Sequence, residues 1–401
     1  MKTTTCIAAL LILAAALPAW AGPLTPVACD PSMALSAKPL YITGSAFKLG
    51  KGAAGLVSSQ ALVGTARANG TTLMVAIDSS KSGASAPDVL RFDFSGKGNF
   101  KGAPTAKLKQ TNPSSRYYTA NFGPIEVKAT INGKATPVTV KGHYIKSGNF
   151  RRLQIFLGTA VEGKCRFGGK ELSVRIIDGN NNLRVGDAWK RRSFGRNITF
   201  TPGDTIAVDL GDGTFSKSVR NACYGSPIEV DGKWYMVRAS ADGKQVAATP
   251  VPMAGGKIHI AHPKWSAMLI GDKYVLPLEG GPKPQALPAG KYDLRSYEEF
   301  SAPDGQGRRA QLTVSPRGSA ASKITVAPGK TTELAIGSPL KASIKATKRG
   351  SQIRLSLVMT DAAGRHITRL TTYGGQRPPK PTVIIKDSTG KQVYQNSLEY
   401  G

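Results

Sequence analysis

Short runs of β-branched and aromatic residues, separated by turn residues, recur along most of the chain. Within many of these runs apolar and polar positions alternate, as they do in strands with one buried face. Asn-Gly and Asp-Gly pairs accept the positive φ angles of tight two-residue hairpins. Three hairpins are therefore predicted, over residues 125–140 around Asn132-Gly133, residues 228–237 around Asp231-Gly232, and residues 383–394 around Thr389-Gly390.

No long stretch with the 3.6-residue period of an amphipathic helix stands out after residue 21. Short strands at regular spacing are typical of sandwiches and open barrels. We therefore predict an all-β fold, with two or three sandwich-like antiparallel domains in tandem after a signal peptide. The expected divisions are a signal peptide at 1–21, an N-terminal β domain at 22–170, a central β region with calcium-loop-like turns at 171–270 and C-terminal β-sandwich modules at 271–401.

The N-terminal segment has the pattern of a secretory signal peptide. Lys2 precedes an apolar core at residues 6–17, and Ala19-Trp20-Ala21 forms a small-residue cleavage site. This core is shorter than the about 20 residues that a membrane-spanning helix needs, and no later stretch is apolar enough for a span. We expect an exported protein, periplasmic, at the cell surface or extracellular, with no transmembrane span after cleavage.

The chain contains 54 Lys and Arg residues against 25 Asp and Glu residues, a formal net charge of +29. Such an excess attracts polyanions, including acidic polysaccharides, lipid head groups and nucleic acids. Nucleic acid is the least favoured of these, because no recognisable nucleic-acid fold or basic helix accompanies the charge. The densest basic cluster, and the predicted polyanion-binding site, consists of Lys190, Arg191, Arg192 and Arg196. The alternative is a solvated basic surface that aids solubility without forming a site.

Three cysteines, Cys29, Cys165 and Cys223, remain once the signal peptide with Cys6 is removed. Disulfides form in exported proteins, and an odd number of cysteines leaves one thiol unpaired. Cys165 and Cys223 each lie beside a predicted strand and a glycine-containing turn. The sequence therefore favours a Cys165–Cys223 disulfide.

Three aspartate-rich loops follow apolar runs and share alternating Asp, Asn and Gly positions. They begin at Asp93, Asp178 and Asp209. In calcium loops with this spacing, alternate side-chain oxygens converge on a Ca²⁺ ion, which takes six to eight oxygen ligands. Calcium is thus the expected cofactor, and its predicted ligands are Asp178, Asn180, Asn182, Asp187, Asp209 and Asp212.

The match to a calcium loop is incomplete. In the Asp178 loop Leu183 occupies the glycine position and Trp189 replaces the acidic residue at position twelve, and in the Asp93 loop Lys97 occupies a ligand position. The alternative is that Asp, Asn and Gly form tight turns between strands and bind no metal.

Two segments resemble known groups of proteins. The D-x-N-x-N loop at Asp178, the run G-D-T-x-x-V-D-x-G-D-G-x-F at residues 203–215 and the following hairpin resemble uncharacterised exported bacterial β-rich proteins, over roughly residues 68–250. This resemblance implies an extracytoplasmic β protein and carries no assigned activity. Residues 286–294 are similar to the P-x-G-x-Y strand entry of carboxypeptidase regulatory-like and transthyretin-like sandwiches, which implies a structural or adhesion module.

Common enzyme signatures are absent from the sequence, which has no G-x-S-x-G elbow, H-E-x-x-H helix, P-loop or Rossmann fingerprint. His259 and His262 lie three residues apart, so on one strand they point to opposite faces rather than to a shared metal. The sequence therefore favours an exported, non-catalytic binding or structural protein of the cell envelope or extracellular space. We expect it to be stabilised by calcium and attracted to an anionic polysaccharide or envelope polymer. The alternative is a secreted hydrolase acting on polysaccharide or peptide.

Overall fold

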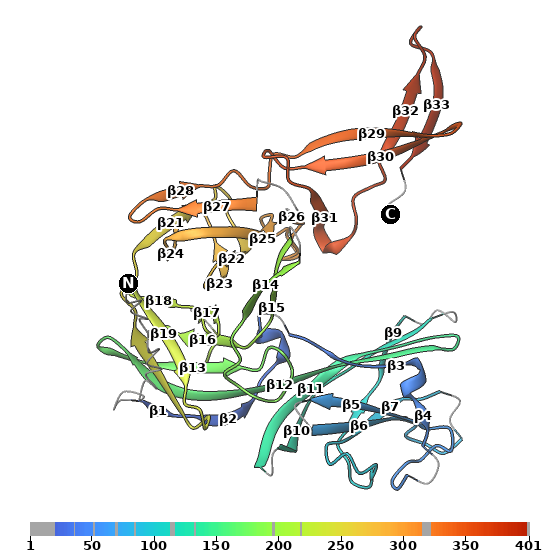
Figure 1. Cartoon of the computed structure of the whole chain (residues 1–401). Helices are drawn as coiled ribbons and strands as arrows, with labels where there is room; N and C mark the ends of the chain where they lie inside the picture. Colours follow the sequence, from blue (N-terminus) through green and yellow to red (C-terminus); the bar gives the residue numbers. More distant parts are fainter. Residues whose placement is uncertain are drawn as a thin grey trace, which may run out of the picture.

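The computed structural model describes residues 21–35, 37–50, 53–68, 71–83, 86–112, 117–131, 134–194, 197–216, 219–314 and 322–398 (Figure 1). Residues 1–20 of the predicted signal peptide and Arg196 lie outside these ranges. Within them the chain is all-β, with several antiparallel sheets and no α-helix, which confirms the predicted fold class. Among the described strands, one pair is parallel, namely β21 (Gly255–His259) with β28 (Thr331–Glu333). The described part of the chain has no helix of the length and apolarity needed to cross a membrane.

A single long strand, β12 (Phe150–Phe167), runs through the first two sandwiches. Its first half pairs with β11 and β3, and its second half pairs with β13 and β2. The resulting sheet follows the order β17-β16-β13-β12-β11-β10-β9. Its other strands are β2 (Thr25–Ala28), β3 (Leu40–Thr43), β9 (Lys109–Asn112), β10 (Tyr118–Ile131), β11 (Lys134–Ser147), β13 (Lys170–Ile177), β16 (Thr205–Asp209) and β17 (Val219–Cys223).

The first sandwich packs the β10–β12 end of this sheet against a five-stranded sheet. Alternate apolar side chains of both sheets form its core, in which the Phe92 and Phe122 rings lie 5.9 Å apart between centroids. The five strands are β4 (Lys48–Leu49), β5 (Leu62–Ala68), β6 (Thr71–Asp78), β7 (Val89–Asp93) and β8 (Thr105–Lys107).

The second sandwich packs the other end of the long sheet against a four-stranded sheet of order β1-β20-β19-β18. Phe167, near the end of β12, meets Tyr235 edge to face at 5.1 Å between ring centroids. The four strands are β1 (Gly22–Pro23), β18 (Ile228–Val230), β19 (Lys233–Ala239) and β20 (Gln245–Pro250).

The third sandwich has its own core around the fully buried Trp265 and Tyr297. One sheet follows the order β23-β22-β25-β26-β31 with β27 paired to β25, and the other contains β24-β21-β28. The strands not yet given are β22 (Trp265–Gly271), β23 (Val275–Gly280), β24 (Gln285–Pro288), β25 (Gly290–Phe300), β26 (Gln311–Val314), β27 (Lys323–Val326) and β31 (Ile367–Thr371).

Two hairpins extend away from the third sandwich (Figure 1). The first pairs β29 (Lys341–Arg349) with β30 (Gln352–Thr360), and the second pairs β32 (Thr382–Lys386) with β33 (Gln392–Ser397). All nine residues of β29 and all six of β33 are exposed. These hairpins therefore present most of their side chains to solvent.

The turns agree with the sequence prediction where the structure describes them. Asp231 and Gly232 connect β18 to β19 with φ angles of 50° and 76°, the two positive angles that a type I′ hairpin requires. The strands that flank residues 132–133 and Thr389-Gly390 also pair as hairpins. Residues 132–133 themselves lie outside the described ranges.

The predicted Cys165–Cys223 disulfide is wrong, because Cys29, Cys165 and Cys223 are all free, buried thiols. The three side chains belong to three different apolar clusters, so none is placed to meet another. Burial raises the pKa of Cys29 and of Cys165 to about 12. The thiols are therefore protonated at neutral pH and act as small apolar side chains of the core.

Candidate functional site

The Asp178 loop, which follows β13, is closed by hydrogen bonds from its own backbone to its first carboxylate. Asp178 is buried and accepts the N–H groups of Asn181 at 2.7 Å and Leu183 at 2.6 Å. Asn181 and Leu183 both have φ of 63°, in the left-handed region. Burial raises the pKa of Asp178 to about 6, although the N–H bonds act to lower it. Asp178 thus holds an unusual turn in place.

Asp204, which immediately precedes β16, connects that strand to the Asp178 loop through hydrogen bonds of its side chain. Asp204 is not among the ligands predicted from the sequence. Its carboxylate is fully buried and accepts the N–H groups of Gly179 at 3.2 Å, Gly186 at 2.6 Å and Asp187 at 2.8 Å. Burial, together with the nearby charge of Asp178, raises the pKa of Asp204 to about 8. A buried acidic pair therefore lies at the base of the loop.

Three of the predicted calcium ligands converge on one point of the loop. The side-chain amides of Asn180 and Asn182 donate to Oδ2 of Asp187 at 3.1 Å and 2.6 Å. Oδ1 of Asn180 is buried and has no hydrogen-bond partner. Neither Asp209 nor Asp212 makes a hydrogen bond with this group. Across the described ranges, no group of three or more His, Cys, Asp or Glu side chains is placed to hold a metal ion.

The Asp209 and Asp93 loops repeat the same turn. Asp209 is buried and accepts the N–H groups of Gly211 and Phe215, both at 2.6 Å. Asp93 accepts the N–H of Gly98 at 2.7 Å. The repeated Asp pattern thus encodes a strand-ending aspartate that binds the backbone of the loop that follows it.

The predicted polyanion cluster lies on a small hairpin of β14 (Lys190–Phe194) and β15 (Asn197–Thr201). Because side chains alternate along a strand, Lys190 and Arg192 share one face and Arg191 lies on the other. Arg191 forms an ion pair with Asp272. Of the three residues that the structure describes, only Lys190 and Arg192 are exposed together on one face.

A second basic surface, which sequence reasoning missed, follows β29. Lys341, Lys345 and Arg349 occupy every fourth position, so they share one face of the strand, and all three are exposed. None of them forms an ion pair with a residue of the described ranges. We name these three residues the basic strip. The signal for it is the alternation of residues 341–349, in which Lys, Ser, Lys, Thr and Arg alternate with Ala, Ile, Ala and Lys.

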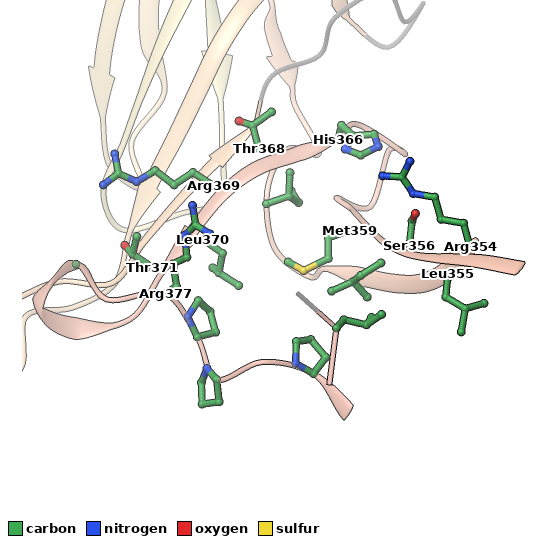
Figure 2. A pocket seen from close by; sticks show the side chains of 17 residues that line it. Arg354, Leu355, Ser356, Met359, His366, Thr368, Arg369, Leu370, Thr371 and Arg377 are labelled. Carbon is green, nitrogen blue, oxygen red and sulfur yellow. The ribbon is translucent and has the colours of Figure 1, made fainter. Parts of the chain in front are cut away.

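A groove of ≈ 1010 Å³ lies between β30 and β31, and the loop that follows β31 also lines it (Figure 2). Figure 2 shows Met359 of β30 and Leu370 of β31 extending toward the space between the two strands. Arg354 lines the groove from β30 and Arg369 lines it from β31. None of the 17 lining residues is Asp or Glu. The groove therefore combines an apolar floor with basic walls.

The fold and these surfaces define an all-β protein of linked sandwiches that carries exposed basic hairpins and an open groove. No protein-family model and no curated protein matches the chain. Among solved structures, the chain is similar to a leucine-rich repeat protein from Bacteroides thetaiotaomicron, with 13% identity and a TM-score of 0.17. The similarity covers 56% of this chain and 24% of that protein. A TM-score this low carries no argument about fold or function.

Proposed function

We propose that this chain is an exported, non-catalytic binding or structural protein that holds an anionic polymer, such as an acidic polysaccharide of the cell envelope, on its basic hairpins. The observation that carries the proposal is the basic strip. Its three charges are exposed and lack ion-pair partners within the described ranges, in a chain with a net charge of +29. Cations without an ion-pair partner can bind an anionic polymer directly, whereas a cation in an ion pair first has to give up its carboxylate partner.

The spacing of the strip suits an extended polyanion. Four residues of a strand span about 13 Å, so Lys341, Lys345 and Arg349 form a row about 27 Å long. Charges about 13 Å apart are separated by more than the Debye length of about 8 Å at physiological salt, so each acts on the polymer largely on its own. A polymer with regularly spaced anionic groups meets them one after another. The attraction is therefore expected to weaken steeply as salt rises.

The acidic groups favour binding over hydrolysis. A general acid has to come within hydrogen-bond reach of the substrate. Asp178 and Asp204, the carboxyls whose pKa is raised, are buried and use their oxygens to accept backbone N–H groups. They are placed to hold a loop rather than to protonate a leaving group.

Calcium is a further part of the proposal and rests on Asp187. A Ca²⁺ ion bound to the Asp187 carboxylate would draw the amide oxygens of Asn180 and Asn182 toward it, which would also give Oδ1 of Asn180 a partner. Asp187 is the one carboxylate in this set, so the expected affinity is at the weak, millimolar end of extracellular calcium sites.

The proposed kinship of the third sandwich with carboxypeptidase regulatory-like or transthyretin-like modules is supported by Tyr292. This side chain is buried in the third core, and its hydroxyl donates to the carbonyl of Pro288 at 2.7 Å. The P-x-G-x-Y segment therefore closes on itself at the start of β25. Such a module suits a structural or adhesive role.

The test is retention on immobilised heparin, measured as the NaCl concentration at elution. The triple variant Lys341→Ala, Lys345→Ala and Arg349→Ala is expected to elute at clearly lower salt than the wild-type chain. The matched control is Lys164→Ala, Lys170→Ala and Lys244→Ala, which removes the same charge from exposed lysines that form ion pairs. Equal shifts for both triple variants would mean that only net charge matters, and the strip would not be a site.

A further inference from the structure

The β29–β30 hairpin is amphipathic, and its apolar face is uncovered. The register of the two strands places apolar side chains opposite one another on the face away from the basic strip. Ile344 is 52% exposed and Ile353 is 67% exposed. The cross-strand pairs on this face are Ala342 with Met359, Ile344 with Leu357, and Ala346 with Leu355. Contiguous apolar surface of this kind on a soluble protein marks an interaction site.

The strands that wall the groove also have open edges. β30 pairs with β29 on one edge, and on the other edge it makes a single bridge from Thr360 to His366. β31 pairs with β26 and, in the described ranges, has no strand on its other edge. The two strands meet at the Thr360–His366 bridge, and the groove lies between them. Open edges present rows of N–H and C=O groups that another strand can pair with.

The base of the groove is held by a buried ionic network. Arg365, in the connection between β30 and β31, lies 3.1 Å from Asp361, and both side chains are buried. The Arg365 guanidinium also donates to the carbonyl of Ala335 at 2.8 Å. Removing one partner of a buried ion pair is destabilising, because it leaves the other charge buried without a partner. The end of β30 and the start of β31 are therefore held to the third sandwich before any partner binds.

The charges around the groove select an acidic partner. Arg354 and Arg369 are exposed and form no ion pair with a described residue, and the lining includes Arg377 and His366 but no carboxylate. A second copy of this chain is disfavoured as the occupant, because its net charge of +29 would be repelled by the basic groove. A polysaccharide would place hydroxyl groups on the apolar floor and offer no peptide backbone to the open strand edges.

We propose that the groove binds an extended segment of another polypeptide, in which apolar residues alternate with Asp or Glu, by strand addition to β30 or β31. The apolar side chains lie on the floor formed by Leu357, Met359 and Leu370, while the carboxylates face Arg354 and Arg369. Backbone hydrogen bonds to the strand edge supply affinity, and the alternating side chains supply specificity. The apolar floor lies on the hairpin face away from the basic strip, whereas Arg354 lies on the same face as the strip, opposite Thr347. The proposal does not depend on polymer binding.

The test uses the chain without its predicted signal peptide and a fluorescein-labelled decapeptide of alternating Val and Glu, with binding followed by fluorescence anisotropy. We expect saturable binding, which the variant Arg354→Glu/Arg369→Glu weakens at least about tenfold. The matched control, Lys164→Glu/Lys244→Glu, makes the same charge change at exposed lysines of the second sandwich, outside the groove lining, and should leave peptide binding within about twofold of wild type. In hydrogen exchange, bound peptide should slow exchange in β30 or β31.

Three results would overturn the proposal. The first is equal binding of a decapeptide of alternating Ser and Glu, because the apolar floor would then play no part. The second is equal loss of peptide binding in both charge variants, which would indicate attraction by net charge alone. The third is concentration-dependent dimerisation that Arg354→Glu/Arg369→Glu abolishes, which would make a second copy the occupant.

Discussion

The buried pair Asp178 and Asp204 should make the stability of this protein fall as pH rises from 5 to 8. An acid whose pKa is raised in the folded state binds more protons when folded than when unfolded, so stability decreases with pH between the two pKa values. Raising the pKa of Asp204 from 3.8 to about 8 corresponds to about 6 kcal/mol, at about 1.36 kcal/mol for each pH unit. Asp178, raised to about 6, adds about 3 kcal/mol over the lower part of that range.

The variant Asp204→Asn removes the titrating group and keeps its shape. One of its side-chain atoms becomes an amide nitrogen, which cannot accept the N–H of Gly179, so we expect a loss of about 1–3 kcal/mol at pH 4. Above pH 8 the order reverses, because the wild-type chain then carries the full cost of ionising Asp204. The two stability curves should cross at roughly pH 5 to 6.

Urea unfolding at a series of pH values, followed by tryptophan fluorescence, measures both curves. Trp189 reports on this site directly, because its indole N–H donates to the main-chain carbonyl of Asp204 at 2.7 Å. The variant Asp212→Asn changes an exposed aspartate of the neighbouring loop and should run parallel to wild type. Wild-type stability that rises from pH 5 to pH 8, or an Asp204→Asn curve parallel to wild type, would refute the reasoning.

Two further predictions concern metal and thiols. Ca²⁺ at about ten times its dissociation constant should stabilise the fold by about 1.4 kcal/mol in a thermal melt, and Asp187→Ala, but not Asp212→Ala, should abolish the shift. A melting temperature that does not change with Ca²⁺ would mean that the Asp178 loop is a tight turn that binds no metal. Cys29, Cys165 and Cys223 should resist a thiol-reactive aromatic disulfide in the native protein and react after unfolding in guanidinium, and rapid reaction of the folded chain would contradict their buried placement.

Local chemistry made the strands and hairpins predictable. Asp231-Gly232 specifies its turn by itself, because both residues accept positive φ. The acidic loops were harder to interpret, since the same Asp and Asn spacing serves a metal or a backbone turn. Only the fold shows that the Asp204 carboxylate accepts the backbone N–H of Asp187, which lies seventeen residues earlier in the chain.

The basic strip and the groove between β30 and β31 were not predicted, because they depend on packing between elements that local sequence patterns do not reveal. The alternation along residues 341–349 identifies an amphipathic strand, but amphipathic strands usually bury their apolar face. That this face is left open, and that β30 and β31 diverge after one bridge, follows from how the hairpin leaves the third sandwich. The disulfide prediction failed for the same reason, because distance between cysteines in the fold cannot be deduced from their neighbours in sequence.

The shared strand β12 has a mechanical consequence. Because one unbroken strand contributes to two cores, separating the first two sandwiches requires β12 to bend or to lose hydrogen bonds to β11 or β13. We therefore expect the first two sandwiches to unfold together rather than one at a time when the chain is extended.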